Sequence, residues 1–182
     1  IESYLAFKSG TELAAALCRE VSLILADRLD KTGHATLAVS GGTTPKLFLE
    51  TLSQETIDWA NVTVTLVDDR CVAPDHERSN ERFVRETLLQ NRAERATFQP
   101  ATASADQSQS EPFIDVLILG MGTDGHTASL FPEGDNLAEA LSGDGDARYV
   151  LMSAPGAEEQ RVTMTLPVIV SAGRLFLHIE GQ

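Results

Sequence analysis

The chain has 182 residues, and 42% of them are hydrophobic, which is enough for one domain with a buried core. Acidic residues outnumber basic ones by 27 to 14, and the resulting net charge of −13 argues against a nucleic-acid partner, because such partners require clustered Lys and Arg. No apolar run approaches the roughly 20 residues of a membrane helix, and no signal peptide is evident. We therefore expect a cytoplasmic protein without a membrane partner.

The first predicted element is a helix over residues 11–31 (TELAAALCREVSLILADRLDK), with Thr11 as its N-cap and apolar side chains along one face. Residues 35–40 (ATLAVS) follow as a short buried strand. A turn with two glycines then leads into a helix that begins near Pro45. A strand, a glycine turn and a helix in this order are typical of an α/β protein.

The same pattern recurs along the chain. Residues 61–70 (NVTVTLVDDR) are predicted to form one strand that ends in charged residues, and the helix after it is capped by Ser79 or Asn80. Further apolar segments follow at 113–120 (FIDVLILG), 148–155 (RYVLMSAP), 160–173 (QRVTMTLPVIVSAG) and 174–181 (RLFLHIEG). We predict an α/β fold of the Rossmann-like type: a single-domain, open, mainly parallel sheet with helices on both faces.

Two stretches lack periodicity and are predicted to be loops. They are residues 99–112 (QPATASADQSQSEP) and residues 133–146 (EGDNLAEALSGDGD).

Three polar clusters follow three successive predicted strands: SGGTTP at 40–45, DDR at 68–70 and GMGTDGHT at 120–127. Neighbouring strand ends in an open parallel sheet converge on one crevice. We therefore expect the three clusters to form a single site.

The first two clusters each allow two interpretations. The backbone N–H groups of SGGTTP suit an anion at a helix N-terminus, but the pattern is equally typical of a tight turn without a ligand. Arg70 could form a surface ion pair with the neighbouring aspartates. Alternatively, its guanidinium is aimed at a phosphate or a developing oxyanion, with Asp68 or Asp69 holding it in place.

The third cluster favours catalysis. Glycines at 122 and 125 lie close to His126 in the sequence and allow close backbone approach, and we place Gly122 in the substrate site. An imidazole there can take a proton from water and return it to a leaving group, and Asp124 can orient it. No histidine pairs with another His or Cys at ligand spacing, so we expect no metal site.

Four segments in this order, SGGTTP, VDDRCVAPDHERSN, LGMGTDGHTASLFP and RVTMTLP, resemble the 6-phosphogluconolactonases, whose wider family also contains the glucosamine-6-phosphate deaminases. The resemblance implies a fold of the sugar-phosphate isomerase/lactonase type. It also implies hydrolysis of a small-molecule sugar phospholactone, 6-phospho-D-glucono-1,5-lactone, to 6-phosphogluconate in the oxidative pentose phosphate pathway. The implied enzyme is a monomer that needs no metal or organic cofactor.

The resemblance also suggests roles for individual residues. His126 matches the family's catalytic histidine, and Asp68 and Arg70 match an acidic-x-Arg site motif; with Asp124 they form the predicted catalytic set. Spacing leaves open which of Lys46, Arg70, Arg82 and Arg161 contact phosphate. The predicted substrate and phosphate site consists of Gly41, Gly42, Thr43, Arg70, Arg82, Gly122 and Arg161.

Two other functions compete with the lactonase. A deaminase of the same family would carry an Asn-Glu pair where this chain has Leu130 and Phe131, so the proton relay for ring opening is missing. A catalytically silent sugar-phosphate sensor would need Arg70 and the glycine loop but no histidine.

Family members usually have a longer segment before Glu111 and continue beyond a strand like the last one here. We therefore expect one domain over residues 1–182, with further residues of the natural protein near 99–112 and after 182 that this sequence does not include.

Overall fold

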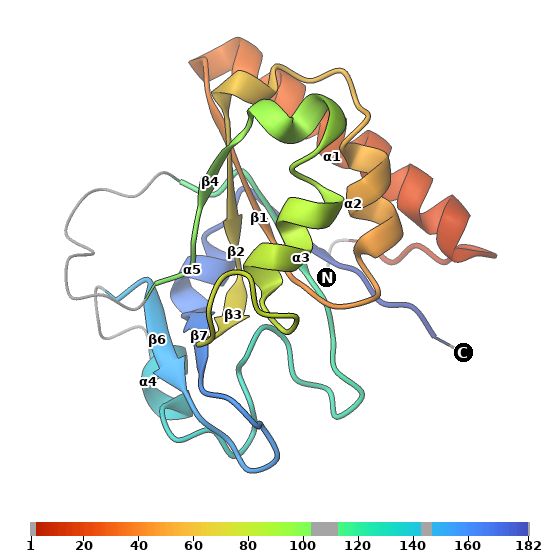
Figure 1. Cartoon of the computed structure of the whole chain (residues 1–182). Helices are drawn as coiled ribbons and strands as arrows, with labels where there is room; N and C mark the ends of the chain where they lie inside the picture. Colours follow the sequence, from red (N-terminus) through yellow and green to blue (C-terminus); the bar gives the residue numbers. More distant parts are fainter. Residues whose placement is uncertain (1–2, 103–112, 143–146, 182) are drawn as a thin grey trace.

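The computed structural model of the protein describes residues 3–102, 113–142 and 147–181 (Figure 1). Its centre is a parallel five-stranded sheet in the order β4-β2-β1-β5-β8. This confirms the predicted α/β fold with a mainly parallel sheet. The strands are β1 (Ala35–Val39), β2 (Val62–Leu66), β4 (Thr97–Gln99), β5 (Val116–Leu119) and β8 (Arg174–Leu177).

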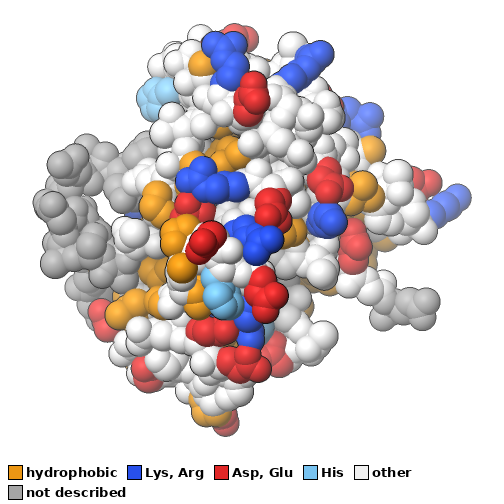
Figure 2. Space-filling model, viewed as in Figure 1, with side chains coloured by type: hydrophobic (Ala, Val, Ile, Leu, Met, Phe, Trp, Pro, Cys, Tyr) orange, Lys and Arg blue, Asp and Glu red, His pale blue; other side chains and the backbone are white. Residues whose placement is uncertain are grey.

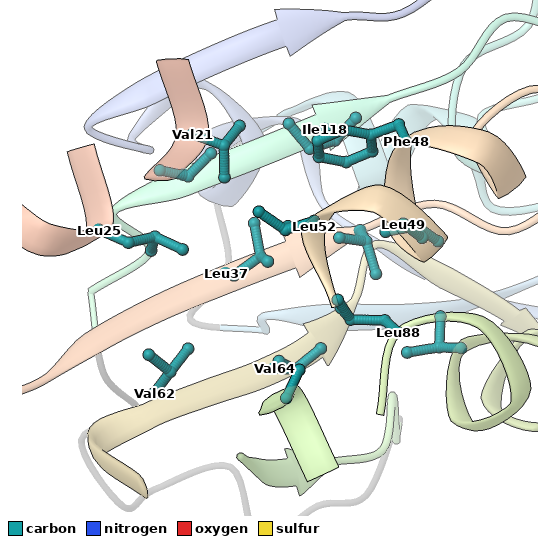
Figure 3. Packing of buried hydrophobic residues seen from close by; sticks show 14 of the residues in the cluster. Val21, Leu25, Leu37, Phe48, Leu49, Leu52, Val62, Val64, Leu88 and Ile118 are labelled. Atoms are coloured by element: carbon teal, nitrogen blue, oxygen red, sulfur yellow. The ribbon is translucent and has the colours of Figure 1, made fainter. Parts of the chain in front are cut away.

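Helices cover both faces of this sheet, as predicted. Along β1, Leu37 and Val39 pack into the cluster formed with α1 (Gly10–Thr32), α2 (Lys46–Leu52) and α3 (Asn80–Thr87). Ala38, which points to the opposite face, packs in a second cluster with Ile169 of α5 (Leu166–Val170). The alternation follows from the period of two along a strand, and Figure 3 shows the first cluster, with Leu37 facing Leu52 of α2.

The N-caps of α1 and α3 can be compared with the predicted ones. Ser9, and not Thr11, caps α1: the Ser9 hydroxyl accepts a hydrogen bond from the Glu12 backbone N–H at 3.2 Å. The prediction of Thr11 was wrong by two positions because both residues are good N-caps. Ser79 caps α3 as predicted, since its side chain accepts from the Arg82 N–H at 3.3 Å.

The segment 61–70 is not one strand, in contrast to the prediction. The chain leaves the parallel sheet after Leu66, and β3 (Asp68–Arg70) joins a second, antiparallel sheet in the order β3-β7-β6. Val67 lies between the sheets: its N–H donates to the Val39 carbonyl at 3.0 Å, and its carbonyl accepts from the Met164 N–H at 2.8 Å. The other two strands are β6 (Tyr149–Met152) and β7 (Arg161–Met164).

The predicted loop at 133–146 contains a helix, α4 (Leu137–Ser142). Its residues, LAEALS, are mostly strong helix formers, and this outweighs the glycines on either side. Of the other predicted loop, Gln99 belongs to β4, and residues 103–112 lie outside the described part of the chain. Two short 3₁₀ helices complete the fold, η1 (Trp59–Asn61) and η2 (Asn91–Arg95).

No helix within the described ranges is long and apolar enough to cross a membrane.

The two leucines of α2 provide a matched test of the core. Leu49 is fully buried in the cluster over β1, whereas Leu47 on the same helix is 42% exposed. We expect Leu49→Ala to lower the free energy of unfolding by about 2–5 kcal/mol through lost burial and a residual cavity. Leu47→Ala should change it by about 0.5 kcal/mol or less. Urea denaturation of both variants measures this, and equal effects would contradict the packing.

Candidate active site

The three polar clusters lie close together, as the sequence predicted. Ser40, just after β1, donates from its hydroxyl to the Ile118 carbonyl of β5 at 3.0 Å, which joins two neighbouring strand ends. The DDR cluster on β3 contacts the glycine turn after β1 through Asn80. It also contacts the loop after β5 through Ser129, whose hydroxyl donates to Asp68 Oδ2 at 2.6 Å. Distant parts of the sequence therefore form one site beyond the strand ends.

The glycine turn after β1 is shaped by its neighbour Asn80. A Cβ atom at Gly41 would overlap with the amide of Asn80, so only glycine fits at this position. Gly42 follows with φ +98°, a conformation that favours glycine. Thr43 accepts a hydrogen bond at its carbonyl from the Lys46 N–H at 3.3 Å, where α2 begins. The turn therefore presents mostly backbone to the site.

Asp69 organises the start of α3. Its Oδ1 accepts from the Asn80 N–H at 2.6 Å, and its Oδ2 accepts from the Glu81 N–H at 3.0 Å. A carboxylate at these free N–H groups is also favoured by the helix dipole. Asp69 therefore fixes α3 to β3.

Arg70 is held by an amide. Its Nη1 donates to Asn80 Oδ1 at 2.5 Å, and among the described residues no carboxylate forms a salt bridge with it. The prediction that Asp68 or Asp69 holds Arg70 was therefore wrong, because both carboxylates have other partners. The sequence suggested Asn80 only as a helix cap, and no local signal linked it to Arg70.

Asp68 is a buried carboxyl group between β3 and the loop after β5. Burial raises its pKa, while the hydrogen bond from Ser129 and the charges of Arg70 and Arg161 act in the opposite direction. The backbone of Ser129 forms a second hydrogen bond, in which its N–H donates to Thr163 Oγ1 at 3.2 Å. Ser129, which was not among the predicted site residues, fixes the loop to both β3 and β7.

The raised pKa of Asp68 predicts how the free energy of unfolding depends on pH. The folded protein binds a proton at Asp68 more tightly than the unfolded chain, so the contribution of Asp68 to stability decreases as pH rises above about 4. Asp68→Asn removes that dependence and keeps an acceptor for Ser129. We expect the free energy of unfolding of the wild type minus that of Asp68→Asn to fall as pH rises from about 4, and then to level off. Urea denaturation at several pH values measures it, and a pH-independent difference would refute the assignment.

Arg161 lies directly opposite Arg70 in the antiparallel pair of β3 and β7. Arg161 is buried, and its pKa is lowered first by burial and then by repulsion from Arg70. The Nε atoms of both side chains are buried without a hydrogen-bond partner among the described residues. Two close guanidinium groups with free donors are an arrangement that an anion would stabilise.

His126 and Asp124 form a pair in the loop after β5. His126 Nδ1 lies 2.5 Å from Asp124 Oδ1, and this hydrogen bond is the largest cause that lowers the pKa of Asp124. An ionised carboxylate only accepts hydrogen bonds, so Nδ1 carries the proton, and in the neutral imidazole Nε2 then has the lone pair. The ring of Phe131 packs beside the imidazole with centroids 4.5 Å apart. The geometry leaves His126 Nε2 available as a base.

The backbone of this loop depends on small residues. Gly122 donates its N–H to the His126 carbonyl at 2.8 Å, and a Cβ at Gly122 would overlap with the imidazole. Gly125 has φ +89°. Ala128, with φ +52°, has a strained left-handed conformation directly before Ser129. The absence of a side chain at Gly122 therefore makes room for the imidazole.

Arg82, which was predicted to bind phosphate, and Lys46, for which this was left open, each have an acidic side chain nearby. Arg82, on α3, donates from Nε to Glu86 at 2.8 Å and from Nη1 to the Asp75 carbonyl at 3.2 Å. Lys46 is exposed and lies 3.9 Å from Glu50. Basic and acidic side chains are interspersed near the centre of the face seen in Figure 2, with a histidine among them. Within the described ranges, no group of three or more His, Cys, Asp or Glu side chains could hold a metal ion.

Comparison with known proteins places the chain in a family. The family model for glucosamine-6-phosphate isomerases/6-phosphogluconolactonase matches residues 8–182. The chain belongs to this family. Its similarity to individual members supports the same assignment and extends over nearly the whole chain.

Two relatives and one solved structure illustrate the similarity within the isomerase/lactonase family. A 6-phosphogluconolactonase of Rhizobium meliloti (strain 1021) is 44% identical, and the match covers 97% of this chain and 81% of that protein. One of Mesorhizobium japonicum (strain LMG 29417 / CECT 9101 / MAFF 303099) is 45% identical, covering 97% and 79%. The crystal structure of a 6-phosphogluconolactonase from Shewanella baltica OS155 matches with a TM-score of 0.90 and 37% identity, covering 97% of this chain and 80% of that one.

Proposed function

We propose that this protein hydrolyses 6-phospho-D-glucono-1,5-lactone to 6-phosphogluconate, the lactonase step of the oxidative pentose phosphate pathway. One observation carries the proposal: the loop with the His126–Asp124 pair is fixed to β3, the strand of Arg70, by the Ser129–Asp68 hydrogen bond. The proposed general base and the proposed anion site therefore lie on segments that are joined directly. The similar proteins of Rhizobium meliloti and Mesorhizobium japonicum are 6-phosphogluconolactonases.

In this mechanism His126 acts as the base. Nε2 takes a proton from a water molecule, whose oxygen attacks the lactone carbonyl to form a tetrahedral intermediate. When the bond between the carbonyl carbon and the ring oxygen breaks, the same nitrogen returns the proton to that oxygen. Asp124 keeps the proton on Nδ1 throughout and stabilises the transient imidazolium. A lactone is an activated ester, so one base and donors for the oxyanion suffice.

The phosphate group of the substrate takes no part in the reaction and serves for binding. We assign it to Arg70 and Arg161, whose paired charges suit a dianion and whose Nε donors have no partner in the described part of the chain. The glycine turn at Gly41, Gly42 and Thr43 contributes backbone to the same site. Because the phosphate is remote from the reacting carbonyl, its binding energy serves to hold the lactone in place for attack.

The competing functions fit less well. A deaminase would need an additional acid at the position of Phe131, whose ring lies beside the histidine in this chain. A silent sensor would have no use for a histidine whose Nδ1 is hydrogen-bonded to a carboxylate and whose Nε2 is left as an acceptor. The proposal also includes a cytoplasmic monomer that needs no metal or organic cofactor, which the family resemblance supports.

The test is the rate of 6-phosphogluconate formation from freshly generated 6-phosphogluconolactone, compared with spontaneous hydrolysis. A protein-dependent rate that scales with enzyme concentration supports the lactonase. A folded protein that binds 6-phosphogluconate but adds nothing to the spontaneous rate would refute it and favour the sensor.

A further inference from the structure

Among the described residues, the carboxylates next to Arg70 in the sequence form no salt bridge with its guanidinium. Asp69 accepts hydrogen bonds from the N–H groups of Arg70, Asn80 and Glu81. Asp68 is bonded to the hydroxyl of Ser129. The side chain that holds the Arg70 guanidinium is therefore the uncharged amide of Asn80.

Asn80 is fixed on several sides. Its Oδ1 accepts from Arg70 Nη1 at 2.5 Å, and its Nδ2 donates to the Asp68 carbonyl at 2.8 Å, so the orientation of the amide is defined. Its own N–H donates to Asp69 at 2.6 Å, and its side chain is buried at 3% exposure. Gly41 packs so closely that a side chain there would displace the amide.

This arrangement has an electrostatic consequence. A carboxylate in the place of the amide would hold Arg70 equally close, but it would neutralise the positive charge. A neutral acceptor restricts the guanidinium and leaves the charge in place. The buried Nε of Arg70 has no hydrogen-bond partner among the described residues, so the described part of the protein does not use this donor.

We propose that Asn80 is a positioning residue that holds Arg70 in the site through an uncharged amide, so that the guanidinium keeps its charge for an anionic group of the substrate. The inference deepens the proposed lactonase function and rests on it for the identity of the anion. It adds a residue to the site that acts through Arg70 rather than on the substrate.

The experiment compares Asn80→Asp, Asn80→Ala and the control Asn61→Asp. Asn61 is exposed at the end of η1, directly before β2. Its variant therefore adds the same charge at the N-terminal ends of the parallel strands, whereas the site lies at their C-terminal ends. Calorimetric titration measures the Kd of 6-phosphogluconate and of inorganic phosphate, and thermal unfolding reports on folding. We expect Asn80→Asp to weaken 6-phosphogluconate binding at least about tenfold, Asn80→Ala to weaken it less, and Asn61→Asp to leave it unchanged.

The order of the two variants is decisive. Aspartate keeps the contact with Arg70 but, like alanine, loses the hydrogen bond to the Asp68 carbonyl, so thermal unfolding is read beside binding. If Asn80 were merely structural, the variant with the lower unfolding temperature would also bind more weakly; an Asn80→Asp variant that binds 6-phosphogluconate as tightly as Asn80→Ala, or that loses binding only in proportion to its loss of stability, would overturn the proposal. If Asn80→Asp does not fold, the inference depends on Asn80→Ala, and unchanged binding of 6-phosphogluconate by that variant would overturn it.

The proposed function fails separately. A wild type that binds 6-phosphogluconate without hydrolysing the lactone refutes the lactonase, while the order of the variants still tests Asn80. A wild type that binds neither 6-phosphogluconate nor inorganic phosphate overturns both.

Discussion

Replacing His126 with alanine should lower kcat for lactone hydrolysis by about 10²–10⁴-fold. The variant removes the only group in our mechanism that moves the proton from water to the ring oxygen. The geometry supports this expectation because the hydrogen bond of Nδ1 to Asp124, at 2.5 Å, leaves Nε2 as the acceptor. The measurement is the initial rate of 6-phosphogluconate formation above spontaneous hydrolysis.

Binding distinguishes lost chemistry from lost structure. His126→Ala should bind 6-phosphogluconate with a Kd close to that of the wild type, since the phosphate is assigned to Arg70 and Arg161. His34→Ala is the control, because His34 is exposed and directly precedes β1, at the end of this strand that is opposite to the site. Full activity in His126→Ala, or an equal loss in His34→Ala, would place the base elsewhere.

Arg161→Met should weaken 6-phosphogluconate binding by about 10–100-fold, as expected for the loss of a charge-assisted contact. The same variant should be at least as stable as the wild type. Burial and the nearby charge of Arg70 both disfavour the charged form of Arg161, and this lowers its pKa. Methionine can fill similar space without a charge to desolvate. Calorimetric titration and urea denaturation measure the two effects.

Arg19→Met is the matched control for this prediction. Arg19 is exposed on α1, so its loss removes the same charge far from β7. We expect neither binding nor stability to change. An Arg161→Met variant that binds as tightly as the wild type would contradict the assignment of the phosphate, and one that is strongly destabilised would show that Arg161 is held by attractive contacts instead.

Much of the fold could be predicted because its signals are local. The buried strands at β1 and β5 are continuous apolar runs, and α1 has an apolar stripe with a helical period. The prediction failed where a tertiary contact competed with the local pattern. Residues 61–70 look like one strand, but Val67 forms hydrogen bonds to both sheets and separates β2 from β3.

The candidate site shows the same division. The pairing of His126 with Asp124 was predictable because only one residue separates them, and glycines leave the loop open around them. The partners of Arg70 were not predictable. Its adjacent aspartates were the obvious choice from the sequence, but Asp69 binds the N-terminus of α3 and Asp68 binds Ser129.

By itself, the sequence determined the α/β class, the convergence of three polar clusters and the histidine that we assign as the base. These follow from periodicity and short-range spacing, which do not depend on the rest of the chain. Only the tertiary structure decided that Arg161 lies opposite Arg70 and that Asn80 holds the guanidinium. Those contacts depend on the register of β3 against β7 and on the packing of α3, because side-chain partners far apart in sequence are set by the complete fold.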